Sequence, residues 1–329
     1  MSKTSDFIRK TFREGDEKRD AGLETPEYVE RYDDLLYGEN EKWQRLDVYR
    51  PKSEAGKRLP VIVSVHGGGW VYGDKERYQY YCMSLVKYGF AVVNFTYRLA
   101  PEYQYPAAVE DTNLVMKWVT EHAEEYLFDA EHVFAVGDSA GAHNLGLYTA
   151  IYTNPEYAEQ YDFKIPEGLK LRAVAFNCGA YQIDPQNEPD DLTMKLMADY
   201  LPDGGTAEEL ARISVAEHIT PDYLPTCFMT CTGDFLQGQA PILQKKFLEC
   251  SVPHEFLFYG DSSHELGHVF HLDMRSEQAE KCNRTECEFF QKFLQGRTQP
   301  DNEMQILLFP PEARSDGIHP YFFTCIDRK

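Results

Sequence analysis

Short apolar runs alternate with longer segments of helical periodicity through most of the chain. The run at 61–65, Val-Ile-Val-Ser-Val, has one polar position and is typical of a strand buried on both faces of a sheet. Further strands are predicted at 91–97, 133–136, 173–177, 227–232 and 255–259, and helices at 76–88, 107–124, 137–152, 239–250 and 276–294. Strands that alternate with helices predict an α/β fold whose parallel sheet is covered on both faces.

Three segments depart from this alternation. Near the N-terminus, 4–20 has the pattern of a charged, weakly amphipathic helix, and 29–51 predicts an antiparallel hairpin that ends at Pro51. Later, the stretch 181–225 is acidic and interrupted by prolines, with short helical pieces between them. This stretch is predicted to be an insertion that folds over one end of the sheet.

The last part of the chain, 296–329, follows the final predicted helix. It contains two apolar clusters, at 306–309 and 321–323, which predict packing on the body of the protein. A contact with a partner, as in a homo-oligomer, is the alternative for so apolar a tail.

Composition and charge narrow the class of protein. The chain has 329 residues, of which 43% are hydrophobic, and this is enough for a sizeable core. Its 33 basic and 54 acidic side chains give a formal net charge of −21, and a field of that sign repels nucleic acids and anionic membranes. We therefore expect neither as a partner, and no apolar run is long enough to predict a membrane span.

The cysteines and the first residues bear on the cellular compartment. The N-terminal residues mix charges and show no apolar core of a secretory signal. The pairs Cys227/Cys231 and Cys282/Cys287 allow metal ligation, but thiols in a reducing cytosol are the simpler interpretation. The expected location is cytoplasmic.

The first candidate for chemistry is Gly137-Asp138-Ser139-Ala140-Gly141, which lies between a predicted strand and a predicted helix. This is the G-x-S-x-G pattern in the strand-to-helix context of a nucleophile elbow. The sharp turn presents the Ser139 hydroxyl at a helix N-terminus, where partial positive charge favours a developing anion. A tight turn without chemistry is the alternative.

A triple-glycine loop, His66-Gly67-Gly68-Gly69, directly follows the predicted strand at 61–65. Three consecutive glycines expose backbone N–H groups with no side chain to block an approaching oxygen. This is what an oxyanion hole requires. A phosphate-binding loop is disfavoured, because no G-x-x-x-x-G-K-[ST] or G-x-G-x-x-G pattern is near.

Three motifs in this order resemble those of the hormone-sensitive-lipase-like esterases of the α/β-hydrolase fold. They are the triple-glycine loop, the segment 97–102 (Tyr-Arg-Leu-Ala-Pro-Glu) with 105–108 (Tyr-Pro-Ala-Ala), and the Ser139 elbow. The resemblance covers about 43–295.

This resemblance implies one domain over 1–329 with a mostly parallel eight-stranded sheet flanked by helices. It also implies a helical cap, formed by about 1–42 and 181–225. The N–H groups of Gly68, Gly69 and Ala140 would form the oxyanion hole.

The acid of a catalytic triad is expected between the serine and the histidine in chain order. Asp234 follows the predicted strand at 227–232, and its Asp-Phe-Leu context resembles the family's Asp-x-Leu motif. Asp191 and Asp199 do not end a core strand. Asp261 does, but it stands close to the candidate histidines in sequence.

Two histidines compete for the role of base. His268 is followed by Val-Phe and matches the family's His-x-Phe pattern, whereas His264 is followed by Glu-Leu and does not. We therefore predict His268 as the base and keep His264 as the alternative. His66 precedes the serine in the chain and is expected to hold its loop.

The same two histidines form an H-E-x-x-H string, His264-Glu265-Leu266-Gly267-His268, which on a helix would bind zinc as in metallopeptidases. Glu286 or Glu288 would then supply a third ligand. The serines and glycines around the string favour a loop over a helix, and a zinc site would leave the elbow without a role.

Together these patterns predict a serine carboxylesterase that hydrolyses short-chain acyl esters through an acyl-enzyme on Ser139, with His268 as base and Asp234 as its partner. The expected substrate is a small-molecule ester, and neither a metal nor an organic cofactor is required. A zinc metallopeptidase and a non-catalytic receptor for a small ligand on the same fold are the alternatives.

Overall fold

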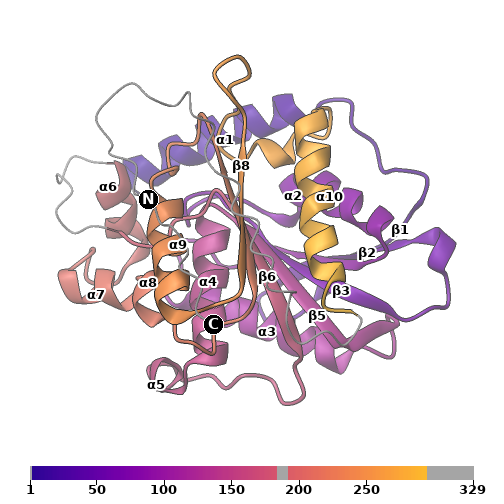
Figure 1. Ribbon diagram of the computed structural model, residues 1–329, viewed down its shortest axis with the longest axis horizontal. Coiled ribbons are helices and arrows are strands. Elements are labelled where there is room, and N and C mark those ends of the chain that lie inside the picture. Colours follow the sequence, from indigo (N-terminus) through magenta and orange to yellow (C-terminus); the bar gives the residue numbers. More distant parts are fainter. Residues whose placement is uncertain (1, 184–191, 295–329) are drawn as a thin grey trace, which may run out of the picture.

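One eight-stranded sheet organises the chain (Figure 1). The computed structural model describes residues 2–183 and 192–294. In chain order the strands are β1 (Val29–Leu36), β2 (Arg45–Pro51), β3 (Leu59–Val65), β4 (Ala91–Phe95), β5 (Phe128–Asp138), β6 (Leu171–Asn177), β7 (Thr226–Cys231) and β8 (His254–Tyr259). Their order in space is β1-β2-β4-β3-β5-β6-β7-β8.

Only β2 runs against the rest of the sheet. β1 and β2 form an antiparallel pair, as predicted for 29–51, and β2 is also antiparallel to β4. All other neighbouring strands are parallel. The predicted α/β fold with a mostly parallel sheet of eight strands is therefore confirmed.

Helices cover both faces of the sheet (Figure 1), because the central strands carry apolar side chains on both of their faces. Val61 and Val63 of β3 belong to the core under α3, α4 and α9, whereas Ile62 belongs to the core under α2 and α10. The bounds are α2 (Lys75–Leu85), α3 (Ala107–Glu121), α4 (Ala140–Thr153), α5 (Pro155–Ala158), α9 (Gln239–Cys250), α10 (Glu277–Gln291) and the short η1 (Lys52–Glu54), η2 (Val86–Tyr88) and η3 (Phe270–Leu272).

Four further helices pack on these layers from outside: α1 (Lys3–Asp20), α6 (Leu192–Tyr200), α7 (Ala207–Arg212) and α8 (Val215–His218). The first of them, α1, is the predicted N-terminal helix, and it packs against α6 (Figure 1). Ser5 of α1 is buried and donates a hydrogen bond to the carboxylate of Asp199 in α6.

Arg9 fastens α1 to two loops of the core. Its guanidinium pairs with the Glu102 carboxylate and donates hydrogen bonds to the carbonyl oxygens of Val71, at 2.8 Å, and Ala100, at 2.9 Å. Residues 184–191 of the predicted insertion and the predicted apolar tail, 296–329, lie outside the described residues.

Several strand boundaries differ by a few residues from those predicted, and two of the differences are informative. β5 starts at Phe128 rather than at 133, because its first residues carry polar side chains that hide the strand in the sequence. β4 ends at Phe95 rather than at 97. Tyr97 lies beyond the end of β4, and its ring stacks on the His66 ring with 3.9 Å between centroids. The Tyr97 hydroxyl donates a hydrogen bond to the His66 carbonyl oxygen at 2.8 Å.

The longest helix of the described chain is α1, with 18 residues, and it is rich in charged side chains. Within residues 2–183 and 192–294, no helix is long and apolar enough to cross a membrane.

A carboxyl group lies buried where α10 packs on the sheet. Glu286 is 2% exposed and accepts hydrogen bonds from the Tyr81 hydroxyl at 2.8 Å and the Asn177 side-chain amide at 2.7 Å. Burial raises the pKa of Glu286 to about 7, although both hydrogen bonds oppose the rise. The folded protein therefore holds a proton on this group at pH values where the unfolded chain does not.

Replacing this carboxyl by an amide is expected to change how stability depends on pH. Since the pKa is higher in the folded state, the free energy of unfolding falls as the pH rises from about 4.5 to about 7. In Glu286→Gln the fall between pH 5 and pH 7.5, measured by urea denaturation, should be smaller than in the wild type by about 2 kcal/mol. The exposed Glu288 of the same helix provides the control, Glu288→Gln. Equal falls in the wild type and Glu286→Gln would contradict the assignment.

Candidate active site

Ser139 stands at the turn between β5 and α4, as the elbow motif predicted. Its backbone has φ 50° and ψ −120°, in a region that residues other than glycine rarely adopt. The Ser139 N–H donates to the carbonyl oxygen of Asn177 at the end of β6, at 2.9 Å. The serine is thus held at the N-terminal end of α4 by the neighbouring strand.

The two glycines of the motif are required by close backbone contacts. A Cβ atom on Gly137 would lie 2.6 Å from the carbonyl oxygen of Gly141. A Cβ atom on Gly141 would lie 2.1 Å from the carbonyl oxygen of Val65 and 2.4 Å from that of His66. Only glycine lets α4 approach the end of β3 this closely.

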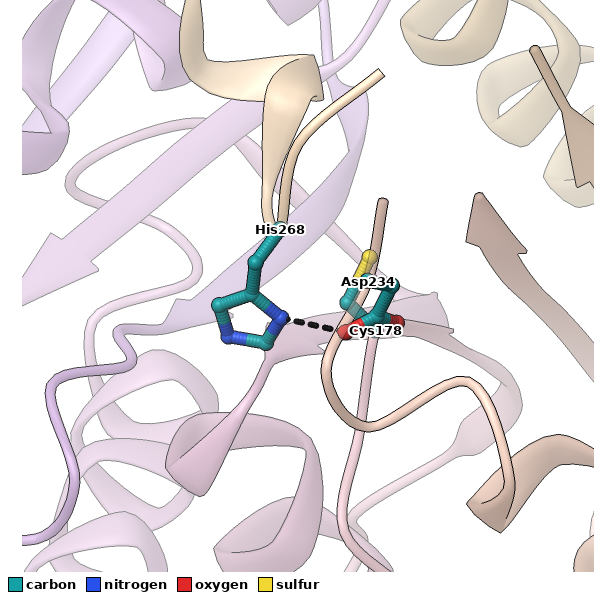
Figure 2. A group of neighbouring side chains, drawn as sticks. All are labelled: Cys178, Asp234 and His268. Atoms are coloured by element: carbon teal, nitrogen blue, oxygen red, sulfur yellow. Dashed lines mark hydrogen bonds and ion pairs between the residues drawn. The ribbon is translucent and has the colours of Figure 1, made fainter. Parts of the chain in front are cut away.

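The structure brings the predicted serine, histidine and aspartate together. His268 Nε2 lies 3.0 Å from Ser139 Oγ, and His268 Nδ1 lies 2.7 Å from Asp234 Oδ1. Figure 2 shows the imidazole pointing at the carboxylate. Asp234 follows β7 and His268 follows β8, and the Gly233 N–H bonds to the Leu266 carbonyl oxygen at 2.8 Å, which aligns the two loops.

The carboxylate of Asp234 is buried but well supplied with donors. Burial raises its pKa, but the hydrogen bond from His268 and those from the Thr230 hydroxyl, at 2.7 Å, and the Leu236 N–H, at 2.8 Å, together hold the pKa below its usual range. Asp234 therefore stays ionised at neutral pH. A fixed negative charge beside Nδ1 orients the His268 ring toward Ser139.

The triple-glycine loop lies beside the elbow. Gly68 has φ 118° and Gly69 has φ 59°, both in the region that favours glycine. A Cβ atom on Gly68 would lie 2.1 Å from the Tyr72 carbonyl oxygen, and one on Gly69 would touch Leu196 of α6 at 3.5 Å. Among the described residues, the N–H groups of Gly68 and Gly69 donate no backbone hydrogen bond, so they can donate to an oxygen of a ligand.

A buried hydrogen-bond chain, which the sequence did not indicate, joins this loop to the elbow. The Tyr78 hydroxyl donates to Asp138 Oδ2 at 2.7 Å and accepts from the Gly67 N–H at 2.8 Å. Burial raises the pKa of Asp138 to about 7. Tyr78 lies on α2, and no motif in its surroundings marks it, whereas Asp138 is the variable position of the elbow motif.

His66 is placed in the core rather than at the serine. It is fully buried against Tyr97, and burial lowers its pKa to about 4, so its ring stays neutral.

The remaining candidates lie apart from this group. The His264 side chain is 81% exposed and faces Asp261 and Ser263. The H-E-x-x-H string forms a loop rather than a helix, so its histidines do not share a helix face. Asp191 lies outside the described residues. Of the predicted third ligands, Glu286 is held by Tyr81 and Asn177, and Glu288 is exposed.

The two predicted cysteine pairs do not form a metal site. All four thiols are free and buried, and in the described part of the chain none belongs to a group of three or more metal-ligating side chains. The arrangement at Ser139 can instead support acyl transfer, because a nucleophile, a base with an oriented partner and N–H donors lie together.

The family model BD-FAE matches residues 46–235, which is more than half of the chain. Among curated proteins, Esterase LipC of Mycobacterium tuberculosis is 30% identical over 159 residues, 47% of this chain and 38% of LipC. Versiconal hemiacetal acetate esterase of Dothistroma septosporum is 27% identical over 236 residues, 66% of this chain and 69% of that protein. The match with LipC covers about two fifths of the length of LipC.

The fold also matches solved structures. A crystal structure of inhibited Esterase B from Lactobacillus rhamnosis superposes with a TM-score of 0.80 at 22% identity, over 88% of this chain and 96% of that one. EstE1, a carboxylesterase cloned from a metagenomic library, superposes with a TM-score of 0.70 at 18% identity, over 88% and 97%. At these identities the likeness concerns the fold.

The close backbone contact at Gly141 predicts that a larger residue at this position destabilises the elbow. In Gly141→Ala the new methyl group collides with two backbone carbonyls, so we expect the free energy of unfolding to fall by about 1–3 kcal/mol in a urea titration. Gly15→Ala is the matched control, because nothing lies within 4 Å of a Cβ atom on Gly15 in α1. Its stability should stay equal or rise. Equal stability of Gly141→Ala and the wild type would refute the contact.

Proposed function

The chain belongs to the BD-FAE family, and on that premise we propose that it is a serine carboxylesterase that hydrolyses short-chain acyl esters. The family match agrees with the resemblance to the hormone-sensitive-lipase-like esterases of the α/β-hydrolase fold that the three motifs indicate. The observation that carries the proposal is the pair of contacts of His268, 3.0 Å to Ser139 Oγ and 2.7 Å to Asp234 Oδ1.

The proposed reaction proceeds through an acyl-enzyme. His268 Nε2 takes the proton of the Ser139 hydroxyl as the oxygen attacks the ester carbonyl, and Asp234 stabilises the imidazolium. The N–H groups of Gly68, Gly69 and Ala140 bind the oxyanion, each such donor being worth about 2.7–4 kcal/mol. The imidazolium then protonates the leaving alcohol. Water, activated by the same histidine, releases the acid.

The helices α1, α6, α7 and α8 are proposed to form the cap of a single domain that spans the chain. Leu196 of α6 reaches the loop at Gly69, and Trp70, the next residue, is buried and stacks on Tyr200 of α6 with 5.3 Å between centroids. Bulky side chains so near the oxyanion loop leave limited room for the acyl chain. This supports small-molecule esters with short acyl groups as substrates.

A cytoplasmic location is part of the proposal. The seven cysteines of the described chain are all free, and six of them are buried. Free thiols are typical of a reducing compartment, where disulfides do not persist.

The catalytic roles can be tested by substitution. Ser139→Ala and His268→Ala should each lower kcat/KM for p-nitrophenyl butyrate by about 10⁴-fold or more, since each removes a member of a triad that acts as a unit. Asp234→Asn should lose a similar factor.

His264→Ala is the matched control for the base, because His264 lies four residues away in an exposed position. It should keep the wild-type rate. If His264→Ala is inactive and His268→Ala is active, the base is misassigned. Ester turnover that survives Ser139→Ala but stops when a chelator is added would favour the metallopeptidase. A wild-type protein that binds a small ligand but hydrolyses no ester would favour the receptor.

Acyl chain length tests the substrate class. Across p-nitrophenyl acetate, butyrate, octanoate and palmitate, we expect kcat/KM to be highest for the two shortest esters and to fall with length, because Trp70 and Leu196 limit the space at the oxyanion loop. A maximum at palmitate would be incompatible with a short-chain esterase, while leaving the triad assignment intact.

A further inference from the structure

A third metal-ligating side chain lies beside the candidate histidine and aspartate. Cys178 directly follows β6, as Asp234 follows β7 and His268 follows β8. Because these strands are parallel neighbours, the three residues meet at one edge of the sheet. One ligand atom of each, the Cys178 Sγ, an Asp234 carboxylate oxygen and a ring nitrogen of His268, lies within 4.8 Å of the others (Figure 2).

The proposed ester hydrolysis gives the Cys178 thiol no role. Its backbone has φ 50°, and its N–H donates to the Met229 carbonyl oxygen at 2.9 Å, which fixes the residue at the strand end. The side chain is fully buried, and the Sγ atom lies 3.8 Å from the Met229 sulfur. A thiol therefore stands at a fixed position against the acid–histidine pair.

Thiolate, imidazole and carboxylate are the three ligand types that zinc prefers in proteins. With bond lengths of about 2.0–2.3 Å, a tetrahedral zinc ion separates its ligand atoms by about 3.3–3.6 Å. The spacing at this edge brackets that range, since Nδ1 and Oδ1 are 2.7 Å apart and the whole group lies within 4.8 Å. Side-chain movements of about 1 Å would therefore complete three ligands of a zinc site.

We propose that Cys178, Asp234 and His268 form an inhibitory binding site for zinc. The ion binds the Cys178 Sγ, an Asp234 carboxylate oxygen and His268 Nδ1, and water completes the tetrahedron. The thiol proton is released to solvent, and the single proton of the neutral imidazole moves from Nδ1 to Nε2, so one Zn²⁺ replaces one proton. The His268 side chain is 16% exposed whereas that of Asp234 is fully buried, so the ion enters on the histidine side.

Binding at this position stops the chemistry through His268. Zinc occupies Nδ1 and takes the carboxylate that would stabilise the imidazolium, and Nε2 carries the proton of the neutral ligand imidazole, so it cannot accept the proton of Ser139. Ser139 then has no base. Binding itself does not depend on ester hydrolysis, whereas the inhibition rests on the proposed function.

Two measurements test the site. The first is inhibition of p-nitrophenyl butyrate hydrolysis by Zn²⁺ and its reversal by a chelator, expressed relative to each variant's own zinc-free rate. The second is the near-ultraviolet charge-transfer band of a thiolate bound to Co²⁺, which needs no turnover. In Cys178→Ala the zinc concentration for half-inhibition should rise by about 10-fold or more, and the Co²⁺ band should vanish. Cys178→Ser repeats both tests with a side chain of nearly the same size.

Two control variants separate this site from others. His264→Ala tests the H-E-x-x-H string, and Cys250→Ala removes the most accessible of the described thiols. Both should keep the zinc sensitivity and the Co²⁺ band. A band that persists in the two Cys178 variants, or zinc sensitivity that is lost in His264→Ala, would overturn the site. A Cys178-dependent band in a protein without esterase activity would support the metal site and refute the proposed function.

Discussion

The close approach of α4 to the end of β3 is the contact on which the site depends. Gly141 rests against the carbonyl oxygens of Val65 and His66, so the helix that carries Ser139 starts directly beside the triple-glycine loop. The buried side chains of Tyr78 and Asp138 connect the loop to the elbow through hydrogen bonds. A parallel sheet makes this possible, since the carboxyl ends of its strands share one edge.

Charge at this edge is controlled by hydrogen bonding as much as by burial. Asp234 and Asp138 are both buried, yet their pKa values move in opposite directions. Asp234 receives hydrogen bonds from an imidazole, a hydroxyl and a backbone N–H, which favour the ionised form. Burial outweighs the donors around Asp138. The carboxyl groups of Asp138, at the end of β5, and Asp234, after β7, thus lose their protons at different pH values, and the one that is ionised at neutral pH contacts the histidine.

Most of the sheet was predictable, because its central strands contain short apolar runs such as 61–65 and the helices between them keep a regular period. The elbow could be located from five residues, since its glycines are dictated by backbone contacts. Chain order and strand ends, together with the Asp-x-Leu and His-x-Phe patterns of the family that the chain resembles, led to Asp234 and His268, which the structure places in contact. What the sequence lacked were contacts between segments far apart. Nothing near Cys178 or Tyr78 indicates that the first lies beside Asp234 or that the second joins two loops.

The pairing of α1 with α6 has a consequence for the order in which the chain can fold. Ser5 and Ile8 are buried, and the Ser5 hydroxyl bonds to Asp199, 194 residues later. During synthesis the first helix therefore leaves the ribosome well before its partner exists. Its apolar side chains stay exposed until α6, 194 residues further along the chain, has been made, and during this period such surface favours aggregation. The many charged residues of α1 help to keep this segment soluble until α6 is available for packing.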